Sequence, residues 1–153
     1  MIDTIIAFLL SMLPVIELRG GIVYAAARGV PFITAFIICF LGNILPIPFI
    51  LLFIRRILSF LERFKYTKKL VEKIENRART KSASIRKYQM FGLFLFVAIP
   101  LPGTGAWTGA LIAALMDLQI KKSFPVIALG VLVAGIIMSI FSFLIPGLFF
   151  HMT

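Results

Sequence analysis

Four long apolar segments are separated by polar ones along the chain, and the apolar segments are of two kinds. Residues 31–54 and 123–150 contain no charged residue, and each exceeds the roughly 20 residues with which a helix crosses about 30 Å of hydrocarbon. We therefore expect each of them to cross a membrane once. Pro46 and Pro48 predict a kink in the first crossing, because proline lacks the amide donor of a helix interior.

The other two apolar segments, 4–27 and 91–116, are interrupted near their middle by proline and glycine. Both residue types weaken a helix, and an unsatisfied backbone group in lipid costs several kcal/mol. Irregular backbone at membrane depth survives only inside protein or beside water. Each segment is therefore predicted to be either a kinked crossing or a re-entrant hairpin that enters and leaves on one face.

The distribution of charge orients the chain and favours the hairpins. Residues 55–90 hold twelve of the sixteen Lys and Arg, which predicts a cytoplasmic linker by the positive-inside rule and argues against a nucleic-acid partner. Apolar residues recur within the linker at helical spacing, as in an amphipathic helix on the inner leaflet, and a solvated orienting loop with no substrate role is the alternative. If 91–116 is a hairpin, Lys121 and Lys122 stay in the cytoplasm, whereas a full crossing would place them outside. Arg28 lies outside under either arrangement.

The two halves of the chain follow the same order, a broken segment and then a long span. A shift of 86 residues places Phe8 on Phe94 and Pro14 on Pro100. With hairpins that do not cross and spans that cross once, the halves enter the membrane from opposite faces, which is an inverted repeat. We thus predict one all-α polytopic membrane domain, 1–153, with a first repeat at 1–54, the linker at 55–90 and a second repeat at 91–153.

Composition agrees with a membrane protein, because 61% of the 153 residues are hydrophobic, more than a domain of this size can bury. The expected location is a prokaryotic cytoplasmic membrane, and the N-terminus is interpreted as mature sequence because no basic region precedes its apolar stretch. A lone Cys39 and a lone His151 provide neither a disulfide framework nor a metal cluster. No enzyme activity and no cofactor are predicted.

Glu17 and Arg19 are the strongest candidates for a functional site. An ionisable side chain inside a membrane segment costs about 2.5–3.5 kcal/mol on insertion scales, so it is normally paired or faces water. A broken turn at residues 17–20 would place both charges on one side. Arg19 could then hold a phosphate or carboxylate, while Glu17 could be its counter-ion or exchange a proton or a sodium ion. A purely structural ion pair remains the alternative.

The second broken segment offers mostly backbone. Its glycine-rich turn precedes a returning helix, whose first amides could meet an anionic group, and Trp107 could stack on a substrate or anchor at the interface. The complete set of predicted binding residues is Glu17, Arg19, Gly20, Gly21, Pro100, Pro102, Gly103, Thr104, Gly105, Trp107 and Thr108, with Arg28 and Asn43 as secondary candidates.

Residues 14–21 (PVIELRGG) and 100–109 (PLPGTGAWTG) resemble the paired motifs of the small multidrug export protein family, and the likeness covers nearly the whole chain. That family is in turn similar to the DedA, or VTT, membrane proteins, which have two facing re-entrant hairpins and include transporters of undecaprenyl phosphate and related lipids. The resemblance implies hairpins and transport. The chain differs from the DedA pattern because its second motif contains neither arginine nor a carboxylate.

Three functions remain open. The first is translocation of an anionic lipid or lipid phosphate such as undecaprenyl phosphate, and the second is ion-coupled export of small drug-like molecules. The third is a structural or assembly role in the membrane. The expected partners are membrane lipids, a lipid-phosphate or small-molecule substrate, and a second copy of the chain, since two full crossings alone do not seal a transport pathway.

Overall fold

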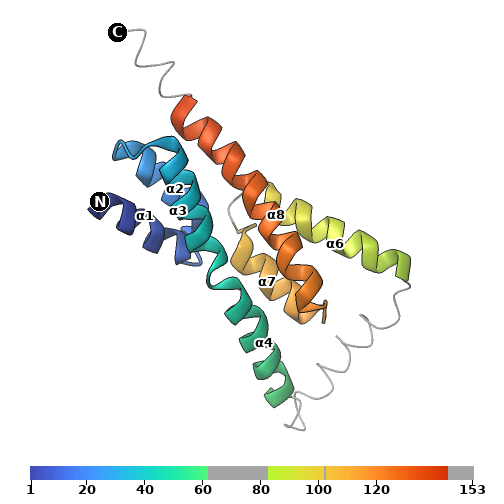
Figure 1. Ribbon diagram of the computed structural model, residues 1–153. Coiled ribbons are helices and arrows are strands. Elements are labelled where there is room, and N and C mark those ends of the chain that lie inside the picture. Colours follow the sequence, from blue (N-terminus) through green and yellow to red (C-terminus); the bar gives the residue numbers. More distant parts are fainter. Residues whose placement is uncertain (62–82, 102, 145–153) are drawn as a thin grey trace.

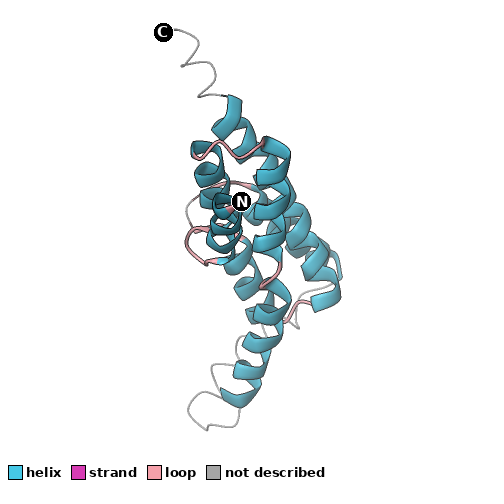
Figure 2. Cartoon of the chain, turned by 60° about the vertical axis from the view of Figure 1, so that its left-hand side comes forward, coloured by secondary structure: helices cyan, strands magenta, loops and turns pink. Residues whose placement is uncertain are grey.

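The expected all-helical class is confirmed by a computed structural model, which describes residues 1–61, 83–101 and 103–144. Helices joined by short loops make up this part of the chain, and no strand occurs in it (Figures 1 and 2). The order is α1 (Ile2–Met12), α2 (Glu17–Ala27), α3 (Phe32–Ile44), α4 (Ile47–Leu61), α6 (Ala83–Ala98), α7 (Ala106–Leu115), α8 (Ile120–Ser139) and the π-helical turn η1 (Ile140–Leu144).

Two helical stretches, Phe32–Ile54 and Ile120–Phe143, are long and apolar enough to cross a membrane, as predicted. Only 28% and 33% of their most apolar windows are buried, so most of their surface is available to lipid. At the kink expected from Pro46 and Pro48, α3 ends and α4 begins on either side of Leu45 and Pro46, and Leu45 keeps helical dihedral angles. Residues 145–150 of the predicted second span lie outside the described part of the chain.

The first broken segment is a pair of antiparallel helices. Residues 13–16 reverse the chain between α1 and α2, where Pro14 prevents one continuous helix. Gly21 lets the two helices approach closely, because a Cβ there would overlap the Ser11 hydroxyl. At the open end, Arg28 Nε donates a hydrogen bond to Asp3 Oδ1 at 2.7 Å, and the Arg28 and Tyr24 hydrogen bonds hold the pKa of the Asp3 carboxyl below its usual range.

The second broken segment is also a helix, a loop and a returning helix. Gly109 of α7 packs against Val97 of α6, so closely that a Cβ on the glycine would lie 2.6 Å from a Val97 methyl. Gly103, in the left-handed region at φ +81°, turns the loop as few other residues can. α6 begins at Ala83, inside the range predicted as linker, and the linker residues 62–82 lie outside the described part.

The core lies where the two halves meet. Figure 1 shows α8 running diagonally across the molecule, with α2 and α3 on one side, α6 on the other, and α7 between α8 and α4. Leu18 of α2, Val97 of α6 and Val131 of α8 are at most 1% exposed. Gly130 and Gly135 of α8 bring these elements together, since a Cβ at either position would meet Val97 or Leu18 at 3.3 Å or less. This packing places the break of the first half beside the break of the second.

Candidate functional site

The two breaks contact each other through Trp107, the only tryptophan in the chain. Its indole Nε1 donates a hydrogen bond to the backbone oxygen of Met12, at the end of α1, at 3.1 Å. Its backbone amide donates to Glu17 Oε1, also at 3.1 Å. One residue of the second half is thus held by both helices of the first broken segment.

Glu17 caps a helix that belongs to the other half of the chain. The carboxylate accepts the Trp107 amide in the first turn of α7, whose own N-cap residue Gly105 makes no side-chain capping bond. A negative charge at this position also complements the helix dipole. Glu17 is 6% exposed, and a Cβ on Gly105 would overlap its carboxylate. The glycine is therefore the residue that allows the charge to reach the helix end.

Arg19 binds the loop between α6 and α7, which is the break of the second half. Its guanidinium donates to the carbonyl oxygens of Leu101 and Thr104, and to that of Ile99 at 3.2 Å. These carbonyls follow the end of α6, where helical partners are no longer available. The Thr104 hydroxyl also accepts from the guanidinium at 3.2 Å and donates to the Ile99 oxygen at 2.8 Å. Arg19 thus binds the loop whose amides lead into α7.

The backbone around these charges differs from the expectation in one respect. A broken turn at residues 17–20 was expected to place the two charges on one side, but the helix is broken at 13–16, and α2 continues through Arg19, Gly20 and Gly21. Glu17 is the first residue of α2 and has a left-handed φ of 52°, a conformation that non-glycine residues seldom adopt. Glu17 and Arg19 therefore both reach the second half from a helix that begins in this conformation, and not from a broken turn.

The other predicted binding residues fall into distinct places. Gly20 and Gly21 pack within α2, where a Cβ would overlap Ile16 or Ser11. Arg28 is exposed and paired with Asp3. Pro100, Gly103 and Thr104 belong to the loop that Arg19 binds, Thr108 lies half-buried in the first turn of α7, and Pro102 lies outside the described residues.

A cavity of about 10 Å³ adjoins the Glu17 carboxylate at the centre of the molecule. Asn43 of α3 lines it and is 2% exposed, and its Oδ1 has no hydrogen-bond partner within the described residues. Asn43 thus lines a small cavity beside Glu17, while its predicted part in binding stays a prediction. The remaining lining residues are Leu18, Arg19, Val97, Gly105, Ala106, Val131 and Ala134.

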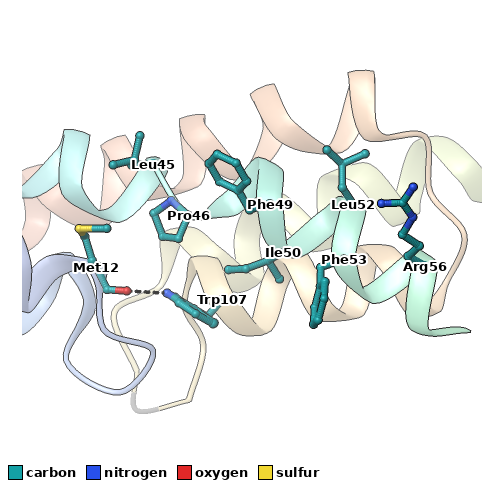
Figure 3. Close-up of a pocket in the computed structure, with 9 residues that line it drawn as sticks. All are labelled: Met12, Leu45, Pro46, Phe49, Ile50, Leu52, Phe53, Arg56 and Trp107. Carbon is teal, nitrogen blue, oxygen red and sulfur yellow. Dashed lines mark hydrogen bonds between the residues drawn. The ribbon is translucent and has the colours of Figure 1, made fainter.

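A much larger apolar groove runs along α4, with a volume of about 1170 Å³. In Figure 3 the side chains of α4 form a row that ends at Arg56 on one side and at Met12 and Trp107 on the other. Phe49 and Phe53 are 68% and 64% exposed. Sequence reasoning missed this groove, because its residues have the same apolar composition as any lipid-facing surface. Its lining is Met12, Leu45, Pro46, Phe49, Ile50, Leu52, Phe53, Arg56 and Trp107.

This geometry changes the chemistry expected of the two charges. The α7 amide predicted to meet an external anion is already bonded to Glu17, and the Arg19 fork predicted to hold a phosphate is bonded to backbone carbonyls. Within the described residues, no group of three or more His, Cys, Asp or Glu is placed to hold a metal ion. Among the described residues, the groove offers more space than the cavity beside Glu17, and Trp107, which lines the groove, is bonded to Glu17.

Comparison with known families adds one finding. A family model described as "Putative small multi-drug export protein" matches residues 17–137. This range begins at Glu17 and includes the second broken segment, α4 and most of α8. Searches of the curated proteins and of the solved structures found no significant match.

Proposed function

Because the chain belongs to the small multi-drug export protein family, we propose that it exports small amphipathic molecules and binds them in the groove along α4. The observation that carries this proposal is the contact between the groove and Trp107. Ligand sites are typically concave, apolar and about 300–1,000 Å³ in volume, with few polar groups. A molecule in this groove would touch the residue through which the two halves are joined.

Facing re-entrant hairpins form the second part of the proposal. The ion pair between Asp3 and Arg28 closes the open end of the first hairpin, while its tip meets Trp107 at the tip of the second. Equivalent helices of the two halves make equivalent contacts. In the first half α1 packs on α3, and in the second half α6 packs on α8. The returning helix of each half contacts the end of the other half's long span, α2 at η1 and α7 at α4. This correspondence supports an inverted repeat, in which a transport site lies between the broken segments.

Export would be coupled to an ion through Glu17. The carboxylate holds α7 only while it accepts the Trp107 amide, and a protonated carboxyl is a weaker acceptor than an ionised one. Protonation would therefore loosen the contact between the halves. Because Trp107 also lines the groove, loss of this contact would change the ligand site, which is the link that coupled transport needs.

Reconstituted protein tests the proposal directly. The full chain is placed in liposomes loaded with a lipophilic dye such as ethidium, and dye efflux is followed after a proton gradient is imposed. We expect efflux that requires the gradient, together with quenching of Trp107 fluorescence when the dye binds. Quenching without efflux would support binding alone, and the absence of both would contradict the proposal.

Replacing Phe53 by alanine should weaken dye binding, because Phe53 provides apolar surface to the groove. Losing contact with one aromatic side chain should raise the dissociation constant by about fivefold, as about 1 kcal/mol of apolar contact is removed. Titration of Trp107 quenching measures the change. Phe91→Ala is the matched control, since Phe91 is similarly exposed at 58% but lies on α6, outside the groove. Equal effects of both variants would argue against the groove.

Anionic lipids are a second candidate substrate, and Arg56 is the observation that favours them. Its side chain lines the groove at the opposite end from Trp107 (Figure 3). A lipid phosphate could place its chain along Phe49 and Phe53 and its headgroup at the guanidinium, which suits phosphate geometry.

Arg56→Gln separates the two substrate classes. If lipid phosphates are carried, their flux should fall about tenfold, in line with the loss of one charge-assisted contact of roughly 1.5 kcal/mol, while ethidium efflux is retained. Flux of a fluorescent lipid phosphate between vesicle leaflets measures the effect. Lipid-phosphate flux that is the same in the variant as in the wild type would exclude this role of Arg56.

A further inference from the structure

The small cavity beside Glu17 is lined by two residues with buried hydrogen-bond acceptors, Asn43 and Glu17, and has too little space for any large ligand. Asn43 Oδ1 has no partner within the described residues, and the adjoining Glu17 carboxylate is 6% exposed. A buried acceptor without a partner costs about 1–3 kcal/mol. A molecule that satisfies both groups must donate hydrogen bonds, or be a cation, and must fit in about 10 Å³.

Size and charge together select the ligand. A buried water needs a volume of about 10–15 Å³ and at least two polar partners, which this cavity provides. Glu17 and Arg19 both line it, and their ionised charges cancel. A sodium ion would leave a net positive charge in the interior, which is costly. The side chains that α6 and α8 place around the cavity are apolar and provide no ligand for a cation. We propose that Asn43 and Glu17 hold a single water molecule between the two halves.

This water gives Glu17 a partner for proton exchange inside the protein, an inference that rests on the proposed ion-coupled export. Apart from Glu17, Arg19 is the one charged residue lining the cavity, while α3 contributes Asn43, and α6, α7 and α8 contribute no titratable side chain. Asn43 is therefore a positioning residue, which orients the water toward the carboxylate.

The structural test is a high-resolution map of the full chain bound to an antibody fragment. We expect one density peak within hydrogen-bonding distance of Asn43 Oδ1, absent in Asn43→Leu, which has a similar volume and no acceptor. The melting temperature should be the same in sodium, potassium and choline chloride. A map that resolves other buried waters but none here would overturn the proposal. A sodium-specific rise in melting temperature, lost in Asn43→Leu, would overturn it in favour of a cation site.

Proton flux distinguishes positioning from a merely structural role. Asn43→Leu should slow dye-driven proton flux into liposomes about tenfold, which is less than the rate loss usually seen when a proton-transfer group itself is removed. Dye binding should be unchanged. Asn43→Ser, which keeps a polar oxygen, should restore part of the flux. Equal losses of binding and flux in Asn43→Leu would contradict the positioning role. If the wild type exports dye without moving protons, the coupling proposal fails, whereas the density peak still decides the water site.

Discussion

Gly105→Ala should cost the protein both stability and transport. The added Cβ would overlap the Glu17 carboxylate, so either the side chain must leave the N-terminus of α7 or the helix must move away. Overpacking typically costs about 1–3 kcal/mol, and losing a helix cap adds about 1 kcal/mol. We expect the free energy of unfolding, measured by SDS titration in mixed micelles, to fall by about 2–4 kcal/mol on these grounds. Dye efflux should fall about tenfold or more.

Gly92→Ala is the matched control for this variant. Gly92 lies within α6, and a Cβ there would meet nothing within 4 Å. Because alanine is favoured over glycine in a helix by about 0.8–1.0 kcal/mol, this substitution should stabilise the protein. The same chemical change is thus expected to have opposite signs at two sites. If Gly105→Ala were also neutral or stabilising, Glu17 would not hold α7 in the way described.

Arg19→Ala should have a comparable effect on stability. It removes the donors to the carbonyl oxygens of Ile99, Leu101 and Thr104. An acceptor that is left without a donor and without water costs about 1–3 kcal/mol. Because Arg19 is itself half-buried, water can replace part of what is lost. We therefore expect a decrease of about 2–3 kcal/mol in the free energy of unfolding.

Two further variants test the geometry behind this expectation. Arg19→Lys should recover only part of the loss, since an ammonium group lacks the planar fork that reaches several carbonyls. Arg28→Ala removes an arginine that is 58% exposed and paired with Asp3, and because water screens such an exposed pair, its loss should change the stability little. If Arg19→Ala abolished flux while leaving stability intact, Arg19 would bind substrate instead of the loop.

Much of the architecture could be predicted because lipid penalises charge and unsatisfied backbone so strongly. The absence of charge from residues 31–54 is enough to indicate a span, and Pro14 and Pro100 are enough to indicate breaks. The exact break at 13–16 was less accessible. Gly20 and Gly21 look like helix breakers in the sequence, but packing against Ile16 and Ser11 makes use of their small size within a helix.

Residues of the candidate site could be predicted in both halves, but the contacts between them could not. Glu17 and Arg19 stand out because ionisable residues are rare in apolar segments, but a sequence does not tell what a charge contacts. Their partners are an amide and carbonyls 80–90 residues away, and backbone atoms leave no signature in side-chain patterns. The groove of α4 was inaccessible for a different reason, since lipid and a ligand favour the same residues.

The capping of one half by the other also has a consequence for biosynthesis. Trp107 is made 90 residues after Glu17, which takes roughly 5–20 s at the usual rate of about 5–20 residues per second. During this interval the buried acid and its neighbouring arginine are already synthesised, but the helix end and loop that satisfy them do not yet exist. We therefore expect the nascent first half to keep both charges near water or the insertion machinery until the second half has left the ribosome.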